Sequence, residues 1–186
     1  MVPYEAPQGR RVNAMGAYFT HGPLTGAFPF VSFASLPKSR AKQPRKTEAE
    51  RAADHGLLPE EVGGLDAEGF LAFLWTIAGR PAAEASESWR RDRPLVIVLD
   101  NYSVHKSTRV KEEVERLRAA NIELFYLPSY SPELSKIEPI WQDVKYREMQ
   151  TRSYTDLGAL KRAVDRALAA KAIMLREAAP LLHRTA

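Results

Sequence analysis

The chain has 186 residues, 45% of them apolar and 27% charged, a balance that predicts one globular domain with a core rather than a disordered chain. The absence of cysteine excludes disulfide frameworks and thiolate metal sites and favours a reducing cytoplasm. No apolar signal core or run of roughly 18 apolar residues is present, so the sequence predicts neither export nor membrane insertion. The net charge of +4 permits a polyanionic partner.

Two strands are predicted near the N-terminus, RRVNAMGAYF (10–19) and GAFPFVSFA (26–34). The turn between them contains Gly22, Pro23 and Gly26, residues that supply turn geometry, so the pair predicts an antiparallel hairpin.

A charged segment follows the hairpin, because apolar residues become scarce from 36 to 64. This segment is interpreted as an insertion with a short helix from Thr47 to Asp54. A longer helix is predicted after Asp66, ending at Gly79, and a second linker extends from 81 to 93.

Basic residues dominate the region between Ala6 and Thr47, which contains no acidic residue. Such a stretch would attract phosphates, although a solvated loop with ordinary surface cations is an equally plain interpretation. The residues predicted to contact DNA here are Lys38, Arg40, Lys42, Arg45 and Lys46.

The most informative region begins with LVIVL (95–99), a continuous apolar run that predicts a strand buried on both faces. Ser107 or Thr108 should cap a helix after it, and IELFYL (122–127) predicts the next strand. Strand, helix and strand in this order predict a right-handed crossover between parallel neighbours. Asp100 would then lie at the carboxyl end of one strand, and the loop toward Glu138 would leave the same edge, where sites in open α/β sheets occur.

Each acid also has a structural interpretation. Asp100 precedes Asn101 and could satisfy loop amides. Ser135 and Glu138 have the S-x-x-E spacing of a capping box. Periodicity predicts that Glu138, Gln142 and Lys145 share a helix face away from the core stripe, which includes Trp141.

Two motifs together carry a family resemblance. LVIVLDNYSVHKS, followed by LPSYSPELSKIEPIWQDVK, resembles the IS630 group of the IS630/Tc1/mariner transposases. The resemblance is strong over 95–145 and implies an α/β fold, in which an RNase H-like mixed sheet is flanked by helices.

The resemblance implies that Asp100 and Glu138 are the second and third acids of an Asp, Asp, Glu set that holds Mg²⁺ or Mn²⁺. Two ions would activate the attacking oxygen and stabilise the leaving oxygen during DNA cleavage and strand transfer. His105 and Lys145 are candidate DNA contacts, with a backbone-bonded histidine and a surface lysine as the alternatives. The sequence departs from the family at Ser135 and Lys136, where Asn and Pro are usual, and its 37 residues between the two acids are slightly more than usual.

The first acid of the set has no clear counterpart. The only acid before the first predicted strand is Glu5, and the short segment around it contains Pro3 and Pro7, which leaves little room for another strand. The chain is therefore expected to lack the first strand and to cleave DNA poorly by itself, with an open edge that another chain could pair with.

The predicted organisation has two parts, an incomplete RNase H-like catalytic domain over 1–150 and a helical segment over 151–186 that packs on it. Ser153 and Asp156 have cap spacing before that helix, whose predicted apolar face includes Leu157 and Leu168. Expected partners are double-stranded DNA at transposon ends and targets, with a homodimer and an upstream fragment of the same element as further candidates. The expected location is the bacterial cytoplasm, on the nucleoid when DNA is bound.

Two other classes remain as alternatives. A non-catalytic DNA-binding remnant would keep the fold and DNA affinity without metal. A sugar hydrolase would need a carboxylic acid of raised pKa and aromatic platforms, which the sequence does not suggest.

Overall fold

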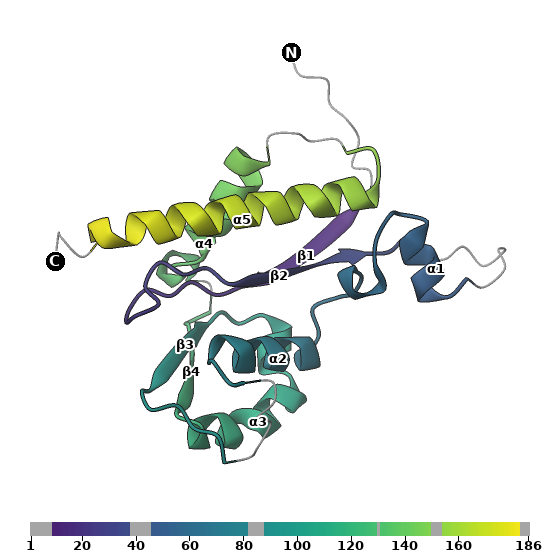
Figure 1. The fold of residues 1–186 in the computed structure, drawn as a ribbon. Helices are drawn as coiled ribbons and strands as arrows, with labels where there is room; N and C mark the ends of the chain where they lie inside the picture. Colours follow the sequence, from purple (N-terminus) through teal and green to yellow (C-terminus); the bar gives the residue numbers. More distant parts are fainter. Residues whose placement is uncertain (1–8, 38–45, 82–87, 130, 150–153, 183–186) are drawn as a thin grey trace. The chain divides into compact units, whose positions relative to one another are not determined.

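The computed structural model describes residues 9–37, 46–81, 88–129, 131–149 and 154–182 (Figure 1). The chain divides into two compact units, which are considered separately: unit 1 is Met1–Gly64 with Pro139–Ala186, and unit 2 is Leu65–Glu138. Each unit contains a two-stranded sheet and helices. The predicted α/β class is confirmed, and the arrangement is consistent with an RNase H-like domain.

The N-terminal hairpin forms the sheet of unit 1. Strand β1 (Arg11–Gly16) pairs antiparallel with β2 (Phe30–Ser35), in a register that joins Arg11 to Ser35 and Gly16 to Phe30. Backbone bonds from the Ala17 and Phe19 N–H groups extend this pairing beyond the regular strands, as the predicted hairpin requires.

The turn of the hairpin uses two glycines at positive φ, Gly22 at 80° and Gly26 at 82°. Only glycine adopts this conformation without strain. Gly26 also lies so close to Ala179 that a Cβ atom would clash with it. The predicted turn residues therefore set both the turn and its approach to the C-terminal helix.

Helix α5 (Leu157–Leu182), the long yellow-green helix of Figure 1, packs against β1 and β2. Leu157 and Leu168 are almost fully buried, and the nearly buried Lys161 Nζ donates to Asp165, 2.6 Å away. The Ser32 hydroxyl of β2 also donates to Asp165. Asp156 accepts a hydrogen bond from the Ala159 N–H, so this acid caps the helix directly, whereas Ser153 lies outside the described residues.

The charged segment after the hairpin contributes to the core of unit 1. Helix α1 (Glu48–Ala53) has Thr47 as its N-cap and a complete capping box with Glu50. Ala52 and Leu57 are buried in a cluster with Ala34 and Leu157. The region from 46 to 64 is therefore anchored by the few apolar residues that it contains. A short 3₁₀ turn, η1 (Pro59–Glu61), completes it.

Unit 2 begins with helix α2 (Ala67–Ile77), in which Asp66 accepts a hydrogen bond from the Gly69 N–H and caps the first turn. The residues of α2 that face the core are Phe70, Leu71, Phe73, Leu74 and Ile77. Helix α3 (Thr108–Ala119) is capped by Ser107. Both helices begin where the sequence predicts.

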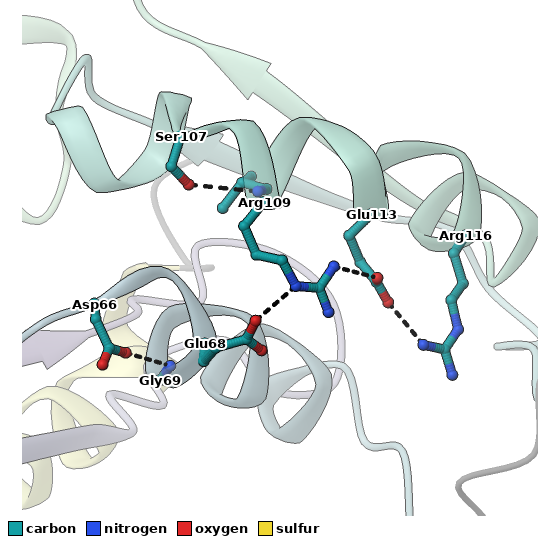
Figure 2. Close-up of polar contacts among 8 residues, drawn as sticks. Asp66, Glu68, Gly69, Ser107, Arg109, Glu113 and Arg116 are labelled. Atoms are coloured by element: carbon teal, nitrogen blue, oxygen red, sulfur yellow. Dashed lines mark hydrogen bonds and ion pairs between the residues drawn. The ribbon is translucent and has the colours of Figure 1, made fainter.

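Ion pairs join α2 to α3, as Figure 2 shows. Arg109 of α3 donates to Glu68 of α2 at 2.6 Å and to Glu113 at 3.2 Å. Arg116 donates to the other oxygen of Glu113 at 2.9 Å, so this buried carboxylate is fully engaged. The hydrogen bond to Glu68 is the main reason that the pKa of Arg109 is raised.

The sheet of unit 2 is the predicted parallel pair, β3 (Leu95–Leu99) and β4 (Ile122–Tyr126). Leu99 and Ile122 are buried, together with Val110 and Leu117 of α3. On the opposite face, however, Val96 is 60% and Val98 55% exposed. The prediction that this apolar strand is buried on both faces is therefore wrong, because the helices of unit 2 cover only one face.

The segment after the parallel pair contains η3 (Pro132–Leu134), α4 (Glu138–Asp143) and η4 (Val144–Glu148). The last element is a π-helix, so the regular spacing predicted from Glu138 to Lys145 is not kept. In unit 1, the Trp141 ring lies 5.4 Å from the Phe28 ring between centroids. Within the described residues, no helix is long and apolar enough to cross a bilayer.

Candidate active site

Asp100 is the first residue after β3, and its side chain is 64% exposed. Its Oδ1 atom accepts a hydrogen bond from the Tyr102 N–H at 3.0 Å and lies 2.8 Å from His105 Nδ1. Only Oδ1 is engaged among the described residues, so Oδ2 is available to a ligand. Asp100 therefore satisfies a loop amide, as one interpretation predicted, and still presents a free oxygen.

His105 belongs to the 3₁₀ turn η2 (Ser103–Lys106) and is held on several sides. Its ring lies against Phe70 of α2, with centroids 4.4 Å apart, and meets Tyr102 edge-on at 5.7 Å. The side chain is only 18% exposed. These contacts hold the imidazole beside Asp100, where Nδ1 also lies 3.3 Å from the backbone carbonyl of that residue, as the backbone-bonded alternative expected. A contact between His105 and DNA stays a prediction.

Hydrogen bonds from the carboxyl end of the sheet support this loop. The Tyr126 hydroxyl donates to the His105 carbonyl at 2.8 Å, and Asn101 Nδ2 donates to the Leu127 carbonyl at 2.7 Å. Burial raises the pKa of Tyr126, which keeps the hydroxyl protonated as a donor. The loop that carries Asp100 is thus tied to β4 at two points.

Glu138 is half-buried, and it is the first residue of α4 and the last of unit 2. Its N–H donates to the Ser135 carbonyl at 3.2 Å. Since Glu138 begins the helix, it does not occupy the third helical position that a capping box with Ser135 requires. The carboxylate has no hydrogen-bond or ion-pair partner among the described residues and is available to a ligand.

The predicted basic contacts fall into different settings. Lys38, Arg40, Lys42 and Arg45 lie outside the described residues. Lys46 is exposed but forms an ion pair with Asp54 at 2.7 Å, which offsets its charge locally. Lys145 is exposed on η4, with its Nζ 5.1 Å from the centre of the Tyr146 ring.

The capacity for metal binding rests on Asp100 and Glu138. Carboxylate oxygens are hard ligands of the kind Mg²⁺ and Mn²⁺ prefer, and both side chains have oxygens free to bind. The described residues contain no group of three His, Cys, Asp or Glu side chains that could hold a metal ion together. The chemistry of the two acids fits a divalent cation, and further ligands would come from substrate, water or another segment.

Comparison with known families places these residues in context. The family model for DDE superfamily endonuclease matches residues 57–161, more than half of the chain. The chain belongs to this family. The match includes both Asp100 and Glu138 and covers all of unit 2. No curated protein matches the chain.

The sequence singled out Asp100 and Glu138, which lie within the residues that match the DDE family, but not the residues that support Asp100. Phe70 lies some thirty residues upstream of Asp100, and the sequence pattern predicted only that it belongs to the core. Tyr126 ends an apolar strand, and nothing in its local pattern indicates a bond to the His105 backbone. The Asp-Asn-x-x-x-His spacing was the available signal, because it returns the histidine to the aspartate after one turn.

Proposed function

We propose that this chain is part of the catalytic domain of an IS630-group transposase and takes part in metal-dependent cleavage and strand transfer of DNA. The observation that carries the proposal is an exposed Asp100, oriented by His105 at the end of β3, within the residues that match a DDE endonuclease. Asp100 and Glu138 are proposed as two of the metal-binding carboxylates.

The residues would divide the work as follows. Asp100 Oδ2 and the carboxylate of Glu138 would hold Mg²⁺ or Mn²⁺. Bound ions of this kind activate an attacking oxygen and neutralise charge at a scissile phosphate. His105, whose Nδ1 lies 2.8 Å from Asp100 Oδ1, would hold this acid in one orientation. Lys145 and the basic segment 38–46 would contact DNA phosphates.

We also propose that a further strand, from an upstream fragment of the same element, pairs with β3 and supplies the first acid. The Leu95 N–H and the Leu99 carbonyl form hydrogen bonds on the side of β3 that faces β4. The backbone N–H and carbonyl groups of successive strand residues point to alternate sides, so those of Val96 and Val98 point to the edge of β3 away from β4. A two-stranded parallel sheet is marginal alone. Pairing at this edge would also place an acid beside Asp100.

Metal binding tests the site. Titration calorimetry with Mn²⁺ should show binding that Asp100→Asn and Glu138→Gln each weaken by about tenfold or more, since each removes an ionic ligand. The exposed Glu112→Gln of α3 is the matched control and should bind as the wild type does. Unchanged Mn²⁺ binding in Asp100→Asn would contradict the proposal.

A DNA cleavage assay distinguishes a nuclease from a non-catalytic DNA-binding remnant. Element-end DNA with Mg²⁺ should be cut only when an upstream fragment with the Asp strand is added. If DNA binds without metal and neither acid variant changes any activity, the chain is a DNA-binding remnant. Robust cleavage by the chain alone, abolished by Glu5→Gln, would show that Glu5 is the first acid.

A further inference from the structure

The π-helix η4 exposes an unusual run of side chains. Its wide turn is closed by the Met149 N–H, which donates to the Val144 carbonyl at 3.0 Å. Lys145, Tyr146, Arg147 and Glu148 are all exposed in succession. Helical segments of this kind are rare and occur frequently at functional sites.

Tyr146 is the largest apolar surface in this run. Its side chain is 68% exposed, although burial of an aromatic ring of this size would be favourable. Lys145 Nζ lies 5.1 Å from the ring centre, close enough for a cation–π contact on one face. The high exposure of the ring leaves it able to stack against a flat group of a ligand.

The base of the π-helix is firmly anchored within unit 1. Val144 is 5% exposed, and the buried Lys171 of α5 forms an ion pair with Asp143. Asp143 Oδ1 also forms an ion pair with Arg147 Nε, 3.2 Å away, which orients a side chain that is 80% exposed. An anchored base and exposed tips are what a preformed binding surface requires, because little ordering remains to be done on binding.

We propose that Tyr146 is a stacking platform for an unpaired base of nucleic acid, with Lys145 and Arg147 contacting the adjacent phosphates. Aromatic rings beside cations bind single strands in this way, since every base has a flat face and every nucleotide a negative charge. Asp143 is balanced by Lys171, so the remaining charges are Lys145 and Arg147 against Glu148. The inference rests on the proposed function only in naming DNA as the nucleic acid.

The test is binding in EDTA, by fluorescence anisotropy, to a labelled single strand of about 15 nucleotides and to the same sequence as a duplex. Tyr146→Ala should weaken single-strand binding by about tenfold and duplex binding by less. Tyr146→Phe and Tyr146→Trp should retain affinity, whereas Tyr146→Leu should not. A 2-aminopurine base in the strand should be quenched by the wild type and not by Tyr146→Ala.

Salt dependence separates stacking from charge. Lys145→Ala should reduce the slope of log affinity against log salt by about 0.7, while Tyr146→Ala leaves the slope unchanged. The exposed Lys111→Ala of α3 is the matched control for lost charge and should bind as the wild type does. Equal unfolding midpoints would show that the Tyr146 variants are folded.

Two results would overturn the inference: wild-type affinity for the single strand in Tyr146→Ala, or full retention in Tyr146→Leu. Because EDTA removes divalent metal, neither result depends on Asp100 or Glu138. Conversely, a failed Mn²⁺ titration would reject the proposed catalytic site and leave the stacking measurement unaffected.

Discussion

The sheets of the two units contain similar apolar residues but differ in how their faces are covered. In unit 1, α5 packs along β1 and β2, and no large apolar side chain of these strands is exposed. In unit 2, the helices cover one face of β3 and β4, while Val96, Val98 and Phe125 on the other face are each more than half exposed. An apolar sequence favours a strand, but its side chains become part of a core only where another element packs against them.

The largest expected effect tests that difference directly. Leu168→Ala should lower the free energy of unfolding by about 3 kcal/mol, because this side chain is 1% exposed and its loss leaves a cavity. The paired variant Val98→Ala, at a side chain that is 55% exposed, should cost about 0.5 kcal/mol or less. Urea unfolding measures both. Similar losses for the two variants would mean that the outer face of β3 is covered in solution.

A smaller effect is expected at the helix caps of the two units. Asp66→Ala removes the cap of α2 and Thr47→Ala the cap of α1, at about 1 kcal/mol each. Asp66→Asn should retain most of the stability, since Asn also caps helices. Amide hydrogen exchange should show each loss mainly in the unit that contains the variant. Equal loosening of both units by either variant would show that they unfold as one.

The smallest expected effect is acid sensitivity in unit 1. The hydrogen bond from Lys171 is the largest cause of a lowered pKa of Asp143. A carboxyl group whose folded pKa lies below its unfolded value, about 3.9, stabilises the protein above that value, and the contribution is lost as pH falls through the folded pKa. Lys171→Met should therefore flatten the fall in unfolding midpoint below about pH 4.

Lys111→Met serves as the control for that experiment, because it removes an exposed cation of unit 2 instead. Its midpoint should fall with acid as the wild type's does. The difference between the two variants should be modest, since Asp143 is partly exposed and water screens the pair. If both variants follow the wild-type profile, the Asp143–Lys171 pair does not contribute to acid stability.

Local features of the fold were predictable from the sequence. The helices after Asp66 and Ser107 begin where predicted, and the two strand pairs have the expected directions. These features depend on neighbouring residues, such as a cap side chain and a backbone N–H three positions away, or the crossover after LVIVL. Asp100 was likewise found as a polar residue directly after an apolar strand.

Tertiary structure decided the features that depend on distant residues. Phe70 and Tyr126 fix His105 on Asp100, although they are far from it in sequence. Ala52 and Leu57 anchor a charged segment because α5 brings Leu157 to them.

The sequence by itself indicated the family, because carboxylates at strand and helix boundaries in a demanding motif belong to few families. It could not determine which apolar faces are covered, nor that the helix after Glu138 would widen into a π-helix that exposes Tyr146. Whether a side chain is buried depends on which other element packs against it. A periodic pattern indicates the apolar face of a helix or strand, but it does not indicate which element covers that face.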